Sequence, residues 1–449
     1  MQAEKILSYS KPVPRYTSYP TAPHFHDGVT GVTYRQWLAA LEPGMRIGLY
    51  VHVPYCDQLC WFCGCHTKHT LRYEPVASYL EQLYREIDLI SALIPAGVEV
   101  SNIHWGGGSP TMLLPDDTRA LSAHLRQAFA FAPDAELAVE IDPRDLTEDK
   151  LDALADAGIG RASIGVQDFS EIVQDAINRQ QSYEVTRDTV EGLRSRGVSS
   201  INCDLVYGLP HQTQDRLLAT VDGVVTLRPD RIAIFGYAHV PWMKKHMQLI
   251  DEAALPGPVS RFEDAAAAAK RLVAAGYERI GLDHFALPED SLAVAAREQR
   301  LHRNFQGYTT DATAALVGLG PSAIGSCPSG YVQNIVAIGE WGRAVDEGRL
   351  PIAKGVVRSD EDTMRAFVIE RLMCSFELST AELDKRFGLS ADFLKYEMAA
   401  LATGELRDLV EFEGGVLRLR ESDRPFVRTV AAAFDTYLRA GKGRHSIAV

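Results

Sequence analysis

The chain has 449 residues, of which 46% are hydrophobic and 23% are charged, an ordinary composition for a globular protein. Its length exceeds what one hydrophobic core commonly supports, so we expect a main domain and a smaller one. The formal net charge of -13 argues against binding nucleic acid or anionic membranes. No stretch has the pattern of a leader or of a membrane span, so we expect a cytoplasmic protein.

The first 30 residues contain the motif PRYTSYPTA (14–22) and are expected to form an N-terminal arm. Arg15 lies there among Tyr16, Tyr19 and several prolines, which favours an ordered segment over a free tail. We expect this arm to cover the mouth of a cavity in the domain that follows, residues 31–350.

Six apolar, β-branched runs come next, and amphipathic helical patterns separate them. The runs are residues 47–53, 100–105, 136–142, 161–166, 200–206 and 231–237. Repeated strand–helix units predict a parallel sheet covered by helices, and therefore the α/β class. Six units favour a partial (β/α)6 barrel of the TIM type over a complete eight-unit barrel. A doubly wound open sheet is the competing topology.

Polar and glycine residues gather mostly at the C-terminal ends of these strands. In strand order they are His52 with four cysteines, GGGSPT (106–111), Glu140 with Asp142, Gln167 with Asp168, Asp204 with YGLP (207–210), and Tyr237 to His239. The carboxyl ends of barrel strands face one rim, where the loops that build active sites converge. The sequence therefore predicts a site on this rim.

The stretch CDQLCWFCGC (56–65) carries four cysteines with the spacing C-x3-C-x2-C-x-C. Zinc sites prefer C-x2-C pairs with a second half elsewhere, and this chain has no such second half. Clustered cysteines in a reducing compartment indicate metal binding or catalysis. If Cys56, Cys60 and Cys63 alone bind an iron–sulfur cluster, one iron keeps an open position.

Cys65 is the fourth cysteine of this stretch, and ligation by it would close the open iron. We interpret Cys65 as a non-ligand near the cluster, with a buried loop residue as the alternative. The remaining cysteines, Cys203, Cys327 and Cys374, are scattered and are expected to be small buried side chains.

A C-x3-C-x2-C loop after the first strand of a (β/α) barrel resembles the radical S-adenosylmethionine (radical SAM) superfamily. The resemblance implies a 4Fe-4S cluster whose open iron holds the methionine group of SAM. The glycines of GGGSPT would let the backbone approach such a ligand, with a tight turn as the alternative. Glu140 suits a pair of ribose hydroxyl groups, because a carboxylate accepts two hydrogen bonds; a salt-bridged rim residue is the alternative.

Further motifs extend the similarity over nearly the whole chain. They are PRYTSYPTA, YVHVPYCDQLCWFCGC (50–65), HWGGGSPT (104–111), EIDPR (140–144), GVQDF (165–169), DLVYGLP (204–210), YAHVP (237–241), GLDHFA (281–286) and LHRNFQGYTT (301–310). On these motifs the chain is similar to the oxygen-independent coproporphyrinogen III oxidase family. Related haem chaperones typically carry Tyr where Phe62 stands and lack the cysteine at position 65.

The resemblance implies two SAM molecules in one cavity. The positions that match the cluster-bound SAM are Tyr50, Gly107, Glu140 and Ile324. Those that match the second SAM are Phe62, Gly108, Ser109, Gln167, Arg179, Asp204 and Ala238. Ser109 departs from the family, which usually has Thr there, but it keeps the hydroxyl group. His52 is a candidate for tuning the cluster, with a core histidine as the alternative.

The implied reaction is the oxidative decarboxylation of two propionate side chains of coproporphyrinogen III to vinyl groups, which gives protoporphyrinogen IX. An unidentified electron donor and acceptor are implied as partners, and we expect a monomer. The substrate carries four carboxylates, so an acidic chain needs local cations to bind it. The candidates are Arg15, Arg303, Lys244 and Lys245, with a solvated surface charge as the alternative for each.

The C-terminal part, residues 351–449, has a different character. Three helical patterns precede LVEFEGGVLRLRES (409–422), which predicts a hairpin turning at Gly414 and Gly415, and a final helix follows. This order predicts a mainly helical, winged-helix-like domain. Its charge balance is slightly acidic, which favours a lid or support over DNA binding.

Two rival functions stay open. One is a haem-binding chaperone on the same scaffold, against which LHRNFQGYTT, PRYTSYPTA and Cys65 argue. The other is a radical SAM methyltransferase or ring-opening enzyme that acts on haem, because a second SAM could donate a methyl group.

Overall fold

Six parallel strands form the centre of the sheet in the computed structural model, which describes residues 3–439. They are β1 (Arg46–Val53), β4 (Glu99–Gly107), β5 (Phe131–Ile141), β6 (Arg161–Gln167), β7 (Ser200–Tyr207) and β8 (Arg231–Gly236). Each strand pairs in parallel with the next one along the chain. A doubly wound sheet reverses its strand order midway, so this consecutive order confirms the partial (β/α)6 barrel.

Residues 1–2, where the predicted arm begins, and residues 440–449, where the predicted C-terminal domain ends, lie outside the described residues.

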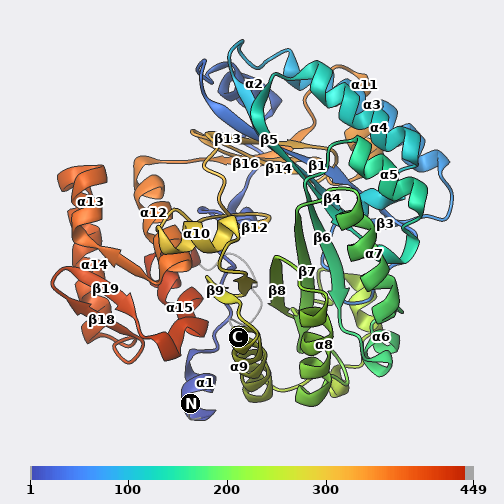
Figure 1. Cartoon of the computed structure of the whole chain (residues 1–449). Helices are drawn as coiled ribbons and strands as arrows, with labels where there is room; N and C mark the ends of the chain where they lie inside the picture. The colour runs from blue at the N-terminus through green and yellow to red at the C-terminus, as the bar shows by residue number, and fades with distance from the viewer. Residues whose placement is uncertain (1–2, 440–449) are drawn as a thin grey trace.

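Helices cover the outer face of these strands (Figure 1). They include α3 (Glu74–Ser91), α4 (Pro115–Ala128), α5 (Glu148–Asp156), α7 (Tyr183–Ser195) and α8 (Gln214–Thr226). Three of them begin at a side-chain cap, because Thr147, Ser182 and Thr213 each accept a backbone N–H from the first turn. Their apolar faces pack on strand residues such as Leu49 and Ile164, which are fully buried.

Short strands that the sequence pattern did not indicate extend the sheet to twelve strands. β13 (Ala315–Leu319) pairs in parallel with β1, and β14 (Ile324–Cys327), β15 (Gly330–Asn334) and β16 (Ile352–Val357) follow as antiparallel neighbours. At the other edge, β10 (His284–Ala286) pairs with β8 and with β9 (Glu278–Ile280). The first extension places Ile324 on β14, which is separated from β1 by β13 alone.

The C-terminal region lies beside the open side of the sheet (Figure 1). It contains α12 (Asp360–Ser375), α13 (Thr380–Phe387), α14 (Asp392–Thr403) and a three-stranded sheet of β17 (Glu377–Ser379), β18 (Val410–Glu413) and β19 (Val416–Leu419). Gly414 and Gly415 have φ of 59° and 79°, as the predicted hairpin turn requires. The three helices and the hairpin confirm the predicted winged-helix-like order.

The predicted final helix is wrong in form, because the structure has short helical pieces in its place. These are η7 (Glu421–Phe426), α15 (Val427–Ala431), η8 (Ala432–Phe434) and α16 (Thr436–Arg439). Pro425 lacks the N–H that a continuous helix needs. The Asp435 carboxylate accepts the N–H groups of Tyr437 and Leu438, which begins a new turn.

The arm is ordered and completes the C-terminal core. It begins with α1 (Ala3–Tyr9), and its buried Ile6 and Tyr16 belong to the same apolar cluster as Phe426. The Tyr16 hydroxyl donates to Asp435 Oδ2 at 3.0 Å. The two ends of the chain therefore form one packed unit.

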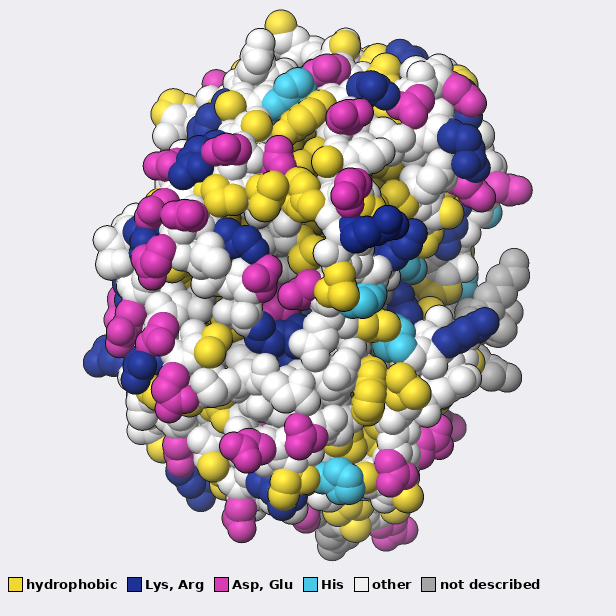
Figure 2. Space-filling view, turned by 90° about the vertical axis from the view of Figure 1, so that its right-hand side faces the viewer, with side chains coloured by type: hydrophobic (Ala, Val, Ile, Leu, Met, Phe, Trp, Pro, Cys, Tyr) yellow, Lys and Arg dark blue, Asp and Glu magenta, His cyan; other side chains and the backbone are white. Residues whose placement is uncertain are grey.

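Smaller elements connect these parts. They are α2 (Gly31–Ala39), β2 (Tyr55–Cys56), β3 (Lys68–His69), α6 (Glu171–Ala176), α9 (Pro258–Ala274), α10 (Ser291–Arg297), β11 (His302–Asn304), β12 (Gly307–Thr309) and α11 (Ile338–Asp346). On the face in Figure 2, Lys and Arg side chains are interspersed with Asp and Glu, so positive charge is dispersed there. Among residues 3–439, no helix combines the length and the apolar character needed to cross a bilayer.

Glu86 on α3 is a buried carboxyl group that fixes the turn after β13. Its side chain accepts the N–H of Gly320 at 2.6 Å and the Nδ2–H of Asn334 at 2.7 Å. Burial raises the pKa of Glu86 to about 7, although these hydrogen bonds oppose the shift. The folded state therefore binds the Glu86 proton more tightly than the unfolded state does. The stability that this proton contributes to the fold is lost as the pH rises through 7.

Replacing Glu86 by Gln is expected to lower the free energy of unfolding by about 1–3 kcal/mol at pH 5.5, because one of the two donors loses its acceptor. The loss is expected to be smaller at pH 8.5, where the wild-type chain carries a buried charge. Urea unfolding at both pH values measures this. Glu81→Gln, an exposed change on the same helix, is the control. Equal losses at both pH values contradict the assignment.

Candidate active site

The cysteine stretch forms the loop after β1, on the rim that the sequence predicts. Cys60 is buried, Cys56 and Cys63 are half-buried, and Cys65 is exposed. The Thr67 hydroxyl donates to Cys56 Sγ at 3.1 Å, and the Cys65 N–H donates to Cys63 Sγ at 3.4 Å. The exposed position of Cys65 differs from the alternative of a buried loop residue. The structure confirms that the three scattered cysteines, Cys203, Cys327 and Cys374, are buried.

The chemistry of this loop fits an anionic iron–sulfur cluster. Hydrogen bonds from Cys65 lower the pKa of the Cys63 thiol to about 7 against the effect of burial, and the positive charges of Lys244 and Arg179 assist. In residues 3–439, no three His, Cys, Asp or Glu side chains are arranged around a single metal ion. The cysteines of a four-iron cluster each bind a different iron, so they do not need that arrangement.

Two arginines and one aspartate flank Cys60 and form an ion-pair network. Arg144 and Arg179 each place a guanidinium nitrogen 3.5 Å from Cys60 Sγ. Both also pair with Asp142, at 2.6 Å and 3.1 Å. Burial opposes ionisation of Asp142, but the two arginines outweigh it and hold the pKa of Asp142 at about 2. The network thus presents fixed positive charge to one cysteine.

The glycine run beside this loop is required by close approaches. A Cβ atom at Gly106 would lie 2.8 Å from the Glu140 carboxylate, and one at Gly107 would lie 2.6 Å from His52 Nδ1. At Gly108 it would lie 2.5 Å from the Tyr55 carbonyl oxygen. Gly107 also has a φ of +114°, which favours glycine. The glycines therefore allow the backbone to pass close to its neighbours, and the run forms part of a cavity wall.

Glu140 is held at this wall as an ionised acceptor. The Gly107 N–H donates to Glu140 Oε2 at 3.1 Å, and His104 Nε2 lies 3.1 Å from Oε1. Burial favours the neutral acid, but the interaction with His104 outweighs it and lowers the pKa of Glu140. The half-exposed carboxylate keeps free acceptor positions for hydroxyl groups of a ligand.

His52 connects the first strand to the cysteine loop. Its Nε2 lies 2.8 Å from the His66 carbonyl oxygen, which only an N–H can satisfy, so Nδ1 is the acceptor for the Tyr50 hydroxyl at 3.0 Å. Burial lowers the pKa of His52, which keeps the ring neutral. His52 therefore supports both the loop and Tyr50.

One cavity of about 730 Å³ collects the first set of predicted ligand positions. Tyr50, Gly107, Glu140 and Ile324 all line it, together with Cys65, His52 and Trp242. We call this space the Glu140 cavity. Residues on β1, β4, β5 and β14 meet here, as strand ends on one rim should.

The residues of the second predicted set do not line the Glu140 cavity. Phe62 packs against an apolar cluster that includes Tyr237, and Arg179 is engaged by Asp142. Gly108 and Ser109 donate their N–H groups to the carbonyl oxygens of Val53 and Tyr55, both at 2.7 Å. Gln167 has a left-handed φ of 67°. Asp204 accepts hydrogen bonds from Ser163 and Asn202, at 2.7 and 2.8 Å.

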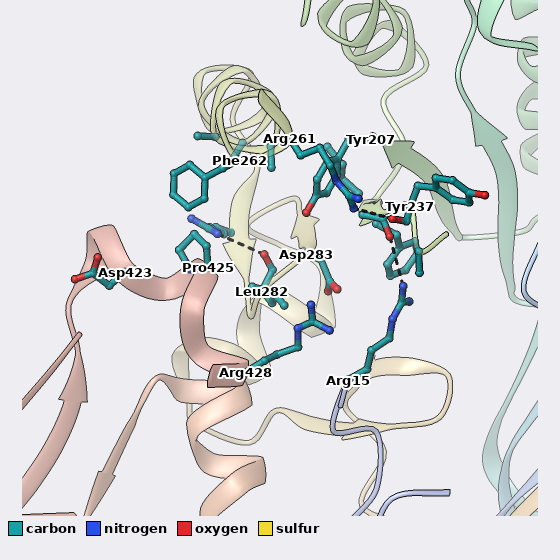
Figure 3. A pocket seen from close by; sticks show the side chains of 18 of the residues that line it. Arg15, Tyr207, Tyr237, Arg261, Phe262, Leu282, Asp283, Asp423, Pro425 and Arg428 are labelled. Carbon is teal, nitrogen blue, oxygen red and sulfur yellow. Dashed lines mark hydrogen bonds between the residues drawn. The ribbon is translucent and has the colours of Figure 1, made fainter. Parts of the chain in front are cut away.

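A second cavity, of about 750 Å³, lies between β8, α9 and the C-terminal region. Ala238 of the second set lines it, as do the two predicted substrate arginines, Arg15 and Arg303. We call it the arginine cavity, because Arg261, Arg279 and Arg428 line it as well. Figure 3 shows Arg15, Arg261 and Arg428 reaching into it from three segments of the chain.

Lys244 and Lys245, the other predicted substrate cations, line neither cavity. Lys244 Nζ donates to the Cys65 carbonyl oxygen at 2.8 Å, and His246 Nε2 donates to the Cys63 carbonyl oxygen at 2.7 Å. The segment after β8 therefore holds the cysteine loop in place.

Several residues of the site carried no specific role in the sequence pattern. Asp142 and Arg144 lie within EIDPR. Their opposite charges, two positions apart, are a pattern that could have indicated the ion pair between them. Trp242 follows the last parallel strand and lines both cavities. Arg261 and Arg428 lie in helical patterns typical of ordinary amphipathic faces, so only the folded chain shows that they meet.

Comparison with known proteins defines the class of this site. A model of the Radical SAM superfamily matches residues 50–224, which span β1 to α8 and include the cysteine loop. The chain thus contains a radical SAM domain, and this class uses an iron–sulfur cluster and SAM.

Curated relatives and a solved structure narrow the class to a family. The chain is 47% identical to an oxygen-independent coproporphyrinogen III oxidase of Bradyrhizobium diazoefficiens, over 100% of both chains. It is 39% identical to the enzyme of that name from Pseudomonas aeruginosa, over 97% of this chain and 96% of that one. The solved structure of coproporphyrinogen III oxidase (HemN) from Escherichia coli matches with a TM-score of 0.90 and 37% identity, over 95% of this chain and 100% of that one. The chain belongs to the oxygen-independent coproporphyrinogen III oxidase family.

Proposed function

We propose that this protein converts coproporphyrinogen III to protoporphyrinogen IX without oxygen. Two propionate side chains are oxidatively decarboxylated to vinyl groups; each loses one hydrogen atom, one CO₂ and one electron. The observation that carries the proposal is the pairing of the Glu140 cavity, beside three clustered thiols, with a cation-lined cavity next to it. The family names of the relatives support the substrate.

The cluster is proposed to bind through Cys56, Cys60 and Cys63, leaving Cys65 free. A bound and reduced cluster would, together with SAM, supply the radical chemistry that removal of hydrogen from a propionate requires. Glu140 orients the SAM ribose, Gly107 shapes the cavity wall, and Tyr50 and Ile324 enclose the ligand. Arg144 and Arg179 stabilise the negative charge of the cluster at Cys60. His52 keeps the loop and Tyr50 in position.

A second SAM molecule stays a prediction from the family resemblance. Arg179 forms an ion pair with Asp142 in this structure. A second SAM molecule can therefore contact Arg179 only if this ion pair rearranges; otherwise it binds without Arg179. Equilibrium dialysis with labelled SAM distinguishes one from two molecules per chain. An external electron donor and acceptor, a cytoplasmic location and a monomeric state belong to the same proposal.

Anaerobic turnover is the test of the function. The reconstituted, reduced protein is mixed with SAM and coproporphyrinogen III, and tetrapyrroles and nucleosides are followed by mass spectrometry. We expect protoporphyrinogen IX together with 5′-deoxyadenosine. Cleaved SAM with an unchanged tetrapyrrole, or a methylated product, contradicts the proposal. Tight haem binding without SAM cleavage favours the chaperone function.

Gly107→Ala tests the cavity wall. The variant is expected to weaken SAM binding at least tenfold, because its methyl group collides with His52 and displaces Tyr50 and Glu140. Gly44→Ala is a matched control, since Gly44 also has a positive φ, of +89°, but nothing lies within 4 Å of the place that its new methyl group would take. In both variants the free energy of unfolding is expected to fall by about 1–2 kcal/mol, because alanine is strained in a left-handed backbone conformation. SAM affinity by calorimetry separates them, and equal affinities contradict the assignment.

A further inference from the structure

The arginine cavity gathers cations in a chain that is acidic as a whole. Among the described residues, six Lys and Arg side chains line it, against three Asp and Glu side chains. The cations are Lys5, Arg15, Arg261, Arg279, Arg303 and Arg428. The carboxylates are Asp283, Glu421 and Asp423, and Lys5 already pairs with Asp423 at 2.7 Å. In the described lining, Lys and Arg therefore outnumber Asp and Glu, while the whole chain has a net charge of -13.

Four of these arginines donate to backbone carbonyl oxygens. Arg261 donates to Tyr237 at 2.7 Å, Arg279 to Leu282 at 3.4 Å, and Arg15 to Gly236 at 3.4 Å (Figure 3). Arg303 donates to the carbonyl oxygen of Arg15 at 3.5 Å. A carbonyl orients a guanidinium group but supplies no full negative charge. Arg261 and Arg303 also lie over the rings of Tyr207 and Tyr308, 5.9 and 4.5 Å from the ring centres. In the described chain, the buried Nε atoms of Arg261, Arg279 and Arg303 have no hydrogen-bond partner.

This arrangement is costly without an anion. Burial, and then the charge of Arg15, lower the pKa of both Arg261 and Arg428. Guanidinium groups stay charged even so, and their mutual repulsion persists. A ligand with carboxylates offsets both the burial and the repulsion, and the planar fork of arginine suits carboxylates.

The cavity also offers apolar surface for the body of a ligand. Phe262, Phe285 and Pro425 line it beside the arginines. Trp242 lines this cavity and the Glu140 cavity alike, with 52% of its side chain exposed. A flat apolar ring system that lies against Trp242 can therefore reach both spaces.

We propose that the arginine cavity binds the carboxylates of the tetrapyrrole that are not reacting, while Trp242 supports the ring system and the reacting propionate lies in the Glu140 cavity. The proposal rests on the proposed function and extends it to Arg261, Arg279, Arg428 and Trp242. These four act as positioning and specificity residues. Affinity then depends on how many carboxylates the ring carries away from the reacting edge.

Coproporphyrin III, the stable oxidised form of the substrate, is the test ligand, with mesoporphyrin IX as a ring that has two carboxylates. Binding to the reconstituted full chain is followed by quenching of tryptophan and porphyrin fluorescence. We expect Arg261→Gln and Arg279→Gln each to weaken coproporphyrin III binding about tenfold. The ratio of the affinity for coproporphyrin III to that for mesoporphyrin IX is expected to fall as well. Arg187→Gln, an exposed change on α7 beside Asp188, is the control and is expected to bind like the wild type.

Background cleavage of SAM without tetrapyrrole is measured on the control Arg187→Gln and is expected to stay within twofold of the wild type. Trp242→Leu is expected to remove most of the tryptophan quenching and to weaken both porphyrins equally. Wild-type affinity for coproporphyrin III in Arg261→Gln and Arg279→Gln, with folding verified by circular dichroism, overturns the proposal. If the variants weaken binding but the wild type releases no decarboxylated product, the cavity assignment stands and the proposed function fails.

Discussion

Replacing Cys60 by Ser is expected to abolish cluster binding and to lower SAM cleavage at least a hundredfold. A serine hydroxyl keeps its proton at neutral pH and is a poor ligand for iron, whereas a thiolate binds it well. Cys60 is the buried member of the loop and lies against Arg144 and Arg179. Iron and sulfide per chain after anaerobic reconstitution, and 5′-deoxyadenosine formed on reduction, are the measurements.

Two other cysteines provide controls for this experiment. Cys65→Ser is expected to keep the cluster, because Cys65 is exposed at the edge of the loop. Cys327→Ser, in a buried strand away from the loop, is expected to keep it as well. A cluster that survives in Cys60→Ser contradicts the three-cysteine assignment, and a cluster lost in Cys65→Ser makes that residue a ligand.

Asp142→Ala is expected to lower the free energy of unfolding by about 3–5 kcal/mol, since it leaves two buried guanidinium groups without their carboxylate. The side chains of Arg144 and Arg179 are only 11% and 7% exposed, so water cannot replace the lost partner. Denaturant unfolding measures the change. Asp188→Ala, which removes the exposed partner of Arg187, is the matched control and is expected to cost less than about 1 kcal/mol.

The same ion-pair network predicts a dependence on pH. The pKa of Asp142 is about 2 in the folded chain, below its usual value of 3.8, so its contribution is fully present above pH 3.8 and is lost as the pH falls through 2. The stability difference between the wild type and Asp142→Asn is therefore expected to narrow as the pH falls through this window. Cluster-free chains are used for both, because acid releases iron. A difference that stays constant contradicts the ion-pair assignment.

The parallel strands were predictable because each repeats one local pattern. An apolar run such as IGLYVHV carries a polar residue near its carboxyl end, here His52, and an amphipathic helix follows further along the chain. β13 to β16 carry no such repeat, since they are short strands. β13 is placed by parallel pairing with β1, and β14 to β16 are placed by antiparallel pairing with one another. The prediction of one final helix was wrong for a local reason, because Pro425 and Asp435 interrupt the helical segment.

The site was predictable where its residues lie on one loop or at strand ends. The cysteine spacing and the GGG run are local, and Tyr50, Gly107 and Glu140 come together because parallel strands end at one rim. The arginine cavity has no local signature. Arg15, Arg261 and Arg428 belong to the arm, a barrel helix and a C-terminal helix, and only tertiary packing brings them together.

The joining of both chain ends in one core has a consequence for biosynthesis. Tyr16 donates to Asp435, a partner 419 positions later in the chain. The arm is among the first segments to leave the ribosome, yet it cannot dock until nearly the whole polypeptide has been translated. The parallel strands and the cysteine loop are complete long before that moment. Arg15 and Arg428 therefore enter the wall of the arginine cavity last, after the strands that carry the cysteine loop have been made.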